Sequence, residues 1–167
     1  MAEDSLLVSR HRSPIGEIVT FYRDDILCHL DFTDCQPRWE KLLKRRFPKL
    51  SLIEVLVNSE MEQRLQAYFT KEKTAFDGIQ MDTGGTGFQN QVWDALCKVP
   101  FGATETYSSM AEIIGKPKAI RAMAAANALN PISIIIPCHR IIGKDGSLTG
   151  YGGGLERKKA LLEHEKN

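Results

Sequence analysis

The sequence predicts an α/β protein of the α+β kind. An N-terminal antiparallel-sheet lobe with flanking helices precedes a mostly helical C-terminal lobe that holds a helix-turn-helix and a short active-site strand. Three observations lead to this prediction: strand-like apolar runs open the chain, helical spacing of apolar residues dominates after residue 88, and a glycine-rich segment, 84–87, lies between the two regions. We therefore expect an N-terminal domain at 1–85 and a C-terminal domain at 86–167.

The first lobe opens with short apolar runs that are typical of strands. Residues 6–8, 15–21 and 26–32 predict three strands, and Asp24-Asp25 predicts the tight turn between the last two. Two helices should follow. Helical spacing of apolar side chains indicates the first at Trp39, Leu42, Leu43 and Phe47 and the second at Met61, Leu65, Tyr68 and Phe69. Ser59 and Glu62 resemble a capping box at the start of the second helix. Residues 74–82 return to an extended pattern.

The second lobe is predicted to begin with a helix that ends at Pro100-Phe101-Gly102. Its apolar face includes Val92 and Leu96, which places Cys97 at the edge of the core. Residues 107–114 and 118–129 then predict two short helices across a Gly-Lys-Pro corner. This is the layout of a helix-turn-helix.

A short β-branched run, 134–136, leads into Pro137-Cys138-His139-Arg140 and predicts a buried strand that delivers a thiol beside an imidazole. A cysteine becomes a nucleophile where a base or positive charge favours the thiolate, and His139 and Arg140 are the local candidates. The alternative is an inert buried cysteine.

The last helix is predicted from Leu155, Leu161 and Leu162, and Glu165 falls beside that apolar face. A carboxylate directed toward a core needs a partner. The glycine-rich loop at 148–154 does not match a phosphate-binding GxGxxG at a strand-helix junction, which argues against nucleotide binding.

Charge and cysteine usage narrow the class of protein. The net charge is +1, but residues 1–85 carry 12 basic and 14 acidic side chains and the remainder carries 10 and 7, so a polyanion should prefer the second part. The four cysteines show neither CxxC spacing nor disulfide-scaffold density, and we find no signal segment or membrane-spanning run. We expect a cytoplasmic protein. A zinc site at Cys28, His29 and Cys35, with or without His11, is an alternative to simple packing of these residues.

Asn130-Pro131, Pro137-Cys138-His139-Arg140 and Tyr151-Gly152-Gly153-Gly154 together resemble the O6-alkylguanine-DNA alkyltransferase family, the methylated-DNA–protein-cysteine methyltransferases. The resemblance implies direct DNA repair in a single turnover. The alkyl group of O6-alkylguanine, and also of O4-alkylthymine, passes from double-stranded DNA to Cys138 after the nucleotide is flipped out through the minor groove. It further implies a monomer that needs no cofactor or metal.

The resemblance also implies a role for each motif residue. Cys138 would accept the alkyl group, with His139 and Glu165 forming a relay through a water molecule, and Tyr107 would assist the departing base. On the DNA side, Arg121 would occupy the space of the flipped nucleotide, while the small side chains of Ala122 and Ala126 either face the groove or pack on the core. Support and pocket roles fall on the remaining residues, Asn130, Pro137, Ile141, Tyr151 and Gly152.

Two other classes of protein remain open from the residues. A cysteine hydrolase would use Cys138, His139 and Glu165 but would turn over repeatedly. A non-catalytic DNA-damage-binding module would keep the helix at 118–129 and leave Cys138 unmodified.

Overall fold

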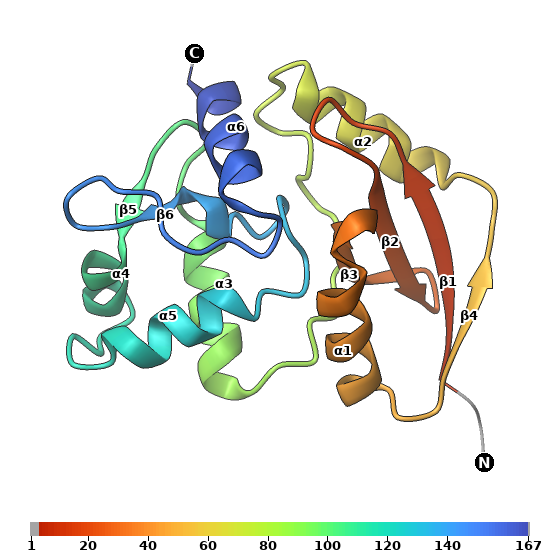
Figure 1. Ribbon diagram of the computed structural model, residues 1–167, viewed down its shortest axis with the longest axis horizontal. Helices are drawn as coiled ribbons and strands as arrows, with labels where there is room; N and C mark the ends of the chain where they lie inside the picture. Colours follow the sequence, from red (N-terminus) through yellow and green to blue (C-terminus); the bar gives the residue numbers. More distant parts are fainter. Residues whose placement is uncertain (1–3, 167) are drawn as a thin grey trace. The chain divides into compact units, whose positions relative to one another are not determined.

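The structure is a computed structural model that describes residues 4–166. The chain divides into two compact units, Met1–Gly84 and Gly85–Asn167. Among the described residues, no helix is both long enough and apolar enough to cross a membrane. The mixed α+β class agrees with the prediction (Figure 1).

The first unit is a four-stranded sheet in the order β3-β2-β1-β4 (Figure 1). β2 pairs antiparallel with both β1 and β3, while β4 pairs parallel with β1 at the sheet edge. The strands are β1 (Asp4–His11), β2 (Ile18–Arg23), β3 (Ile26–Phe32) and β4 (Leu50–Glu54). The three predicted strands and the turn at Asp24-Asp25 are confirmed, and both aspartates have positive φ. β4 was not predicted, because its residues are mostly exposed and show no alternation in burial.

Three helical segments accompany this sheet: η1 (Thr33–Cys35), α1 (Gln36–Arg46) and α2 (Ser59–Phe69). Trp39 and Leu43 of α1 pack on one face of the sheet and join a core with Leu6, Val8, Val19, Phe21, Cys28 and Phe47. α2 is capped by Asn58, whose side chain accepts from the Met61 N–H at 2.9 Å, so the predicted Ser59 capping box is wrong by one residue. Both residue types cap well, and the backbone geometry decided between them.

The zinc alternative finds no support in this unit. Cys28 is buried and donates from Sγ to the Phe21 carbonyl at 3.3 Å, as a packed core thiol does. His29 instead contacts Asp31, which also binds Arg38. Within residues 4–166 there is no group of three or more His, Cys, Asp or Glu side chains placed to hold a metal ion.

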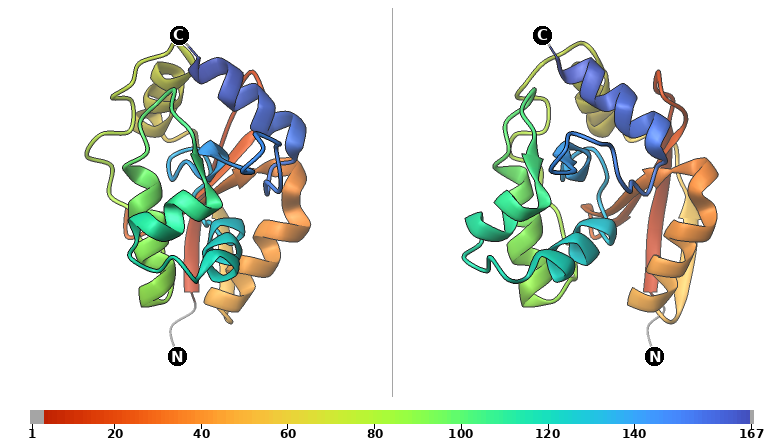
Figure 2. Two further views of the ribbon diagram at one scale, coloured as in Figure 1. Left: turned by 90° about the vertical axis from the view of Figure 1, so that its left-hand side faces the viewer. Right: turned by 60° about the vertical axis from the view of Figure 1, so that its left-hand side comes forward.

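Up to residue 166, the second unit contains four α-helices, one 3-10 turn and a two-stranded parallel sheet. Its elements are α3 (Gly87–Cys97), β5 (Glu105–Thr106), α4 (Tyr107–Ile113), α5 (Ile120–Ala128), η2 (Cys138–Arg140), β6 (Ile141–Ile142) and α6 (Leu155–Glu165). α4 and α5 confirm the predicted helix-turn-helix layout. α3 begins with a capping box between Thr86 and Gln89. Figures 1 and 2 show α6 beside the η2 turn against which it packs.

Two burial predictions for this unit are wrong. Cys97 is exposed, because it is the last residue of α3 and the apolar stripe passes through Val92 and Leu96 instead. Leu155 is 50% exposed; the buried face of α6 consists of Lys158, Leu161 and Glu165. Their i, i+3, i+7 spacing is that of one helical face, but two of the three are charged, so apolarity alone did not reveal it.

Candidate active site

Cys138 opens the η2 turn and is 6% exposed. The residues before it are buried as predicted but form turns instead of a strand. The Ile136 N–H donates to the Ile132 carbonyl at 3.0 Å, and Ile134 has a φ of 71°, which a β-branched residue rarely adopts. An apolar run in a sequence predicts that the segment is buried but does not fix its backbone conformation. In this structure the strand is β6, which follows the cysteine.

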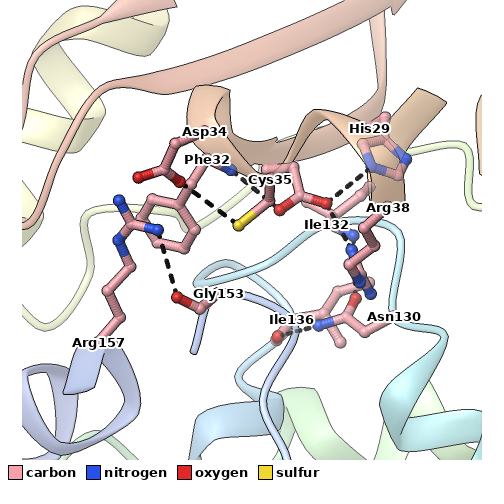
Figure 3. A network of polar contacts seen from close by, with 11 residues as sticks. His29, Phe32, Asp34, Cys35, Arg38, Asn130, Ile132, Ile136, Gly153 and Arg157 are labelled. Carbon is pink, nitrogen blue, oxygen red and sulfur yellow. Dashed lines mark hydrogen bonds and ion pairs between the residues drawn. The ribbon is translucent and has the colours of Figure 1, made fainter. Parts of the chain in front are cut away.

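Asn130 holds these turns together (Figure 3). Its side-chain Nδ2 donates to the Ile136 carbonyl at 2.7 Å, and its Oδ1 accepts from the Ile132 N–H at 2.9 Å. The residue is fully buried, so both contacts lie in a low-dielectric interior where a lost partner is costly. Asn130 therefore bonds both ends of the turn that delivers Cys138, and its supporting role stays a prediction.

His139 and Glu165 meet in the interior, although they lie 26 residues apart in the chain. His139 Nε2 contacts Glu165 Oε2 at 2.8 Å, with both side chains at most 1% exposed. Arg140 binds the same carboxylate twice: its Nε donates to Oε1 at 2.8 Å and its Nη2 to Oε2 at 3.0 Å. Both carboxylate oxygens of Glu165 are therefore occupied by charged or imidazole donors.

The electrostatics of this cluster define which nitrogen of His139 can act as a base. Burial works to raise the pKa of Glu165, but hydrogen bonds from His139 and Arg140 outweigh it and hold that pKa below its usual range. An ionised carboxylate only accepts hydrogen bonds, so His139 Nε2 carries the proton. Burial lowers the pKa of His139 despite Glu165, which favours the neutral ring. Nδ1 is then the acceptor, and it is buried with no hydrogen-bond partner among residues 4–166.

Arg140 also ties this cluster to the end of α3. Its Nη1 donates to the Val99 carbonyl at 2.6 Å, and its guanidinium lies over the Phe101 ring at 5.8 Å. The next residue, Gly102, has a φ of 86°, and a Cβ added to it would lie 3.0 Å from the Glu165 carbonyl oxygen. The tight turn at Gly102 therefore lets the chain approach the end of α6, where Glu165 is held.

The glycine-rich loop before α6 is fastened by side chains from two helices. Lys158 Nζ donates to the carbonyls of Thr149 at 2.7 Å and Gly150 at 3.4 Å. The Tyr107 hydroxyl donates to the same Thr149 carbonyl at 3.3 Å and accepts from Thr149 Oγ1 at 3.2 Å. Arg157 Nη1 donates to the Gly153 carbonyl at 3.2 Å (Figure 3). Tyr107 thus contacts this loop through Thr149.

Lys158 is fully buried, which is unusual for a lysine. No carboxylate among residues 4–166 lies within ion-pair distance of it. Burial lowers its pKa, and the Cys138 sulfur opposes that shift. The Lys158 ammonium and an ionised Cys138 sulfur therefore attract each other. Sequence reasoning missed Lys158 and the role of Thr149; the i, i+3, i+7 spacing of Lys158 with Leu161 and Glu165 was the available signal.

The remaining predicted pocket residues cluster around this turn. Ile141 is fully buried in β6, and Pro137 is buried directly before the thiol. The ring of Tyr151 stands edge-on to the imidazole of His139, with centroids 6.3 Å apart. Gly152 follows it and is half-buried.

The helix-turn-helix residues divide into two sets. Arg121 and Ala122 are exposed near the start of α5. Ala126 is only 3% exposed, and its carbonyl accepts from Trp93 Nε1 at 2.9 Å. Of the two alternatives for Ala126, the structure shows packing on the core. Alanine is small enough for either environment, and α3 packs against this side of α5.

The fold and the site define the class: a two-unit α+β protein in which a buried His-Glu-Arg cluster adjoins a cysteine, in the same unit as a helix-turn-helix. The model of the 6-O-methylguanine DNA methyltransferase DNA binding domain matches residues 87–167. A methylated-DNA–protein-cysteine methyltransferase of Methanosarcina barkeri is 44% identical over 155 residues, 93% of this chain and 94% of that protein. One of Haemophilus influenzae is 39% identical over 166 residues, 97% of this chain and 87% of that protein.

Solved structures agree with these relatives. The crystal structure of Mycobacterium tuberculosis OGT in complex with DNA has a TM-score of 0.80 and 40% identity, covering 97% of this chain and 92% of that one. This chain belongs to the methylated-DNA–protein-cysteine methyltransferase family. The predicted family and fold class are confirmed.

Proposed function

We propose that this protein repairs alkylated DNA directly by moving the alkyl group from O6-alkylguanine to its own Cys138 sulfur. One observation carries the assignment to this cysteine. His139, the next residue, contacts the buried Glu165 carboxylate through Nε2, its Nδ1 has no hydrogen-bond partner among residues 4–166, and burial favours its neutral ring. An imidazole held in this tautomer is arranged to take a proton from the thiol through a bridging water molecule.

The chemical step balances within the protein and its substrate. The Cys138 thiol gives its proton toward His139 Nδ1, and the thiolate attacks the alkyl carbon. A C–S bond forms, the C–O6 bond breaks, and the electron pair leaves on the guanine, which then takes up a proton. The product thioether is a poor leaving group, so one protein molecule repairs one lesion.

The surrounding residues support this step. Glu165 and Arg140 orient His139, and the Lys158 ammonium favours the thiolate by its positive charge. Tyr107, from α4, assists the departing base once its hydroxyl leaves Thr149. Asn130 and Pro137 set the turn that aims the sulfur, and Tyr151, Gly152 and Ile141 line the base pocket.

Exposed Arg121 on α5 enters the base stack where the damaged nucleotide is flipped out. Ala122, beside it, leaves room for the DNA backbone to approach. We propose docking of a protein monomer on the minor groove of double-stranded DNA in the cytoplasm. O4-alkylthymine presents an alkyl group at the equivalent exocyclic oxygen and should be a second substrate.

The decisive experiment is the stoichiometry and position of methyl transfer. After incubation with excess O6-methylguanine duplex DNA, mass spectrometry should find one added methyl group per protein, on the Cys138 peptide, and none in Cys138→Ser. Cys97→Ser is the matched control, because that exposed cysteine should not contribute. Methylation at another residue would overturn the assignment. Repeated turnover would favour a hydrolase instead.

A further inference from the structure

The side chain of Thr149 has a single hydrogen-bond partner among residues 4–166, the phenol of Tyr107. Thr149 Oγ1 donates to the Tyr107 hydroxyl oxygen at 3.2 Å, and that hydroxyl donates in turn to the Thr149 carbonyl at 3.3 Å. The two residues lie 42 positions apart in the chain, one at the start of α4 and the other on the glycine-rich loop. The Tyr107 hydroxyl therefore accepts from Thr149 in one bond and donates to it in another.

The bond in which Tyr107 donates is easily exchanged for another acceptor. The Thr149 carbonyl also accepts from the ammonium of buried Lys158, at 2.7 Å. O–H···O bonds usually span about 2.5–3.0 Å, so the bond of 3.3 Å from Tyr107 to this shared oxygen is long. The O–H of Tyr107 can therefore turn away from the carbonyl while Thr149 Oγ1 still donates to the phenol oxygen.

The proposed transfer places charge on that phenol oxygen. When the C–O6 bond breaks, the electron pair stays on the guanine, and the Tyr107 O–H supplies the proton that the guanine takes up. The phenol oxygen is then negatively charged until water returns a proton to it. Hydrogen bonds to a charged acceptor are shorter and about twice as strong as neutral ones. A donor already aimed at the phenol oxygen therefore stabilises the transition state more than it stabilises the resting protein.

We propose that Thr149 is a positioning residue for the alkyl transfer: its hydroxyl donates to the Tyr107 oxygen while the Tyr107 proton moves to the departing base. The inference rests on the proposed function, which assigns Tyr107 to that base. Lys158 acts in the same direction. It binds the carbonyl of Thr149, so no more than two hydrogen bonds separate its positive charge from the phenol, and positive charge favours a developing phenolate.

Single-turnover methyl transfer from saturating O6-methylguanine duplex DNA to the full-length protein measures this role. Thr149→Val keeps the shape of the side chain and removes its hydroxyl, and it should slow the transfer about fivefold, the worth of one hydrogen bond. Thr149→Ser should restore the wild-type rate. Ser147→Ala is the matched control, because it removes an exposed hydroxyl two residues away that does not bond Tyr107 in the described chain, and its rate should equal that of the wild type.

A double-mutant cycle separates this role from simple fastening of the loop to α4. In the Tyr107→Phe background, Thr149→Val should cause no further loss of rate, because the oxygen that accepts its bond is absent. The dissociation constant for undamaged duplex DNA should change by less than about twofold, since an interaction that strengthens in the transition state affects the rate and not the binding.

Four results would overturn the inference: a wild-type rate in Thr149→Val, an equal loss of rate in both backgrounds, a loss of DNA affinity in place of rate, or a failure of Thr149→Ser to restore the rate. If the wild type gains a methyl group at Cys138 in those experiments, the proposed function stands and only the role of Thr149 is refuted. If Cys138 gains no methyl group, both are refuted.

Discussion

Replacing Glu165 by glutamine should destabilise the second unit far more than loss of one negative charge on a surface would. The carboxylate is 1% exposed and both of its oxygens accept hydrogen bonds. Oε2 accepts from His139 Nε2 and Arg140 Nη2, and Oε1 accepts from Arg140 Nε. Glutamine offers only one acceptor oxygen. Its amide nitrogen must therefore face either the His139 N–H or the Arg140 guanidinium.

The magnitude follows from the charge left behind. Arg140 is 10% exposed, and removing the anion of a buried pair costs about 3–5 kcal/mol because the remaining ion stays desolvated. Some compensation is expected, because Arg140 keeps its bond to the Val99 carbonyl. We expect a loss near 3 kcal/mol. The double variant Arg140→Met, Glu165→Gln should be about 2 kcal/mol less destabilised than the sum of the single variants, because no unpaired ion remains.

Urea unfolding at pH 7 measures this loss, with Trp39→Phe as the background so that Trp93 alone reports on the second unit. Trp93 is buried there and donates to the Ala126 carbonyl. Glu163→Gln, exposed on the same helix, should change stability by no more than about 0.5 kcal/mol. If Glu165→Gln costs less than about 1 kcal/mol, or no more than Glu163→Gln, the proposed charge coupling is refuted.

Four further predictions follow from the same region. Lys158→Met should raise the pH at which the Cys138 thiol reacts with iodoacetamide at half its maximal rate, and it should slow methyl transfer. Lys159→Met, at an exposed position of the same helix, should do neither. If the pH dependence of the reaction and the transfer rate are unchanged in Lys158→Met, Lys158 does not act on the thiol. Asn130→Ala should cost about 2–3 kcal/mol in urea unfolding, because it leaves a buried N–H and a buried carbonyl unpaired. Gly102→Ala should slow methyl transfer by displacing the end of α6; a wild-type rate would contradict this. The pKa of His139 is lowered in the folded state, so the unfolded chain takes up the proton at a higher pH than the folded protein does. The free energy of unfolding should therefore fall as the pH drops below about 6.5, by up to about 1.4 kcal/mol per pH unit. Urea titrations at several pH values measure this, and a free energy of unfolding that does not change with pH would contradict a neutral buried ring.

Local patterns in the sequence were sufficient for most elements of this fold. The turn at Asp24-Asp25, the helices around Val92 and Met110, and the Gly-Lys-Pro corner of the helix-turn-helix each depend on a few neighbouring residues. Periodicity and turn chemistry report such short-range preferences directly. The motif around Cys138 also identified the family, because a run of specific residues carries more information than composition does.

Other features depended on contacts between residues distant in the chain. The edge strand β4 exists because it pairs with β1, and the isoleucines before Cys138 turn back because Asn130 bonds both ends of the segment. The burial of Lys158 and of Ala126 is set by packing between helical segments. Sequence alone determined which groups could do chemistry in this protein. Tertiary structure decided which of them meet, because the energy of a buried ion or hydrogen bond depends on partners that the local sequence does not contain.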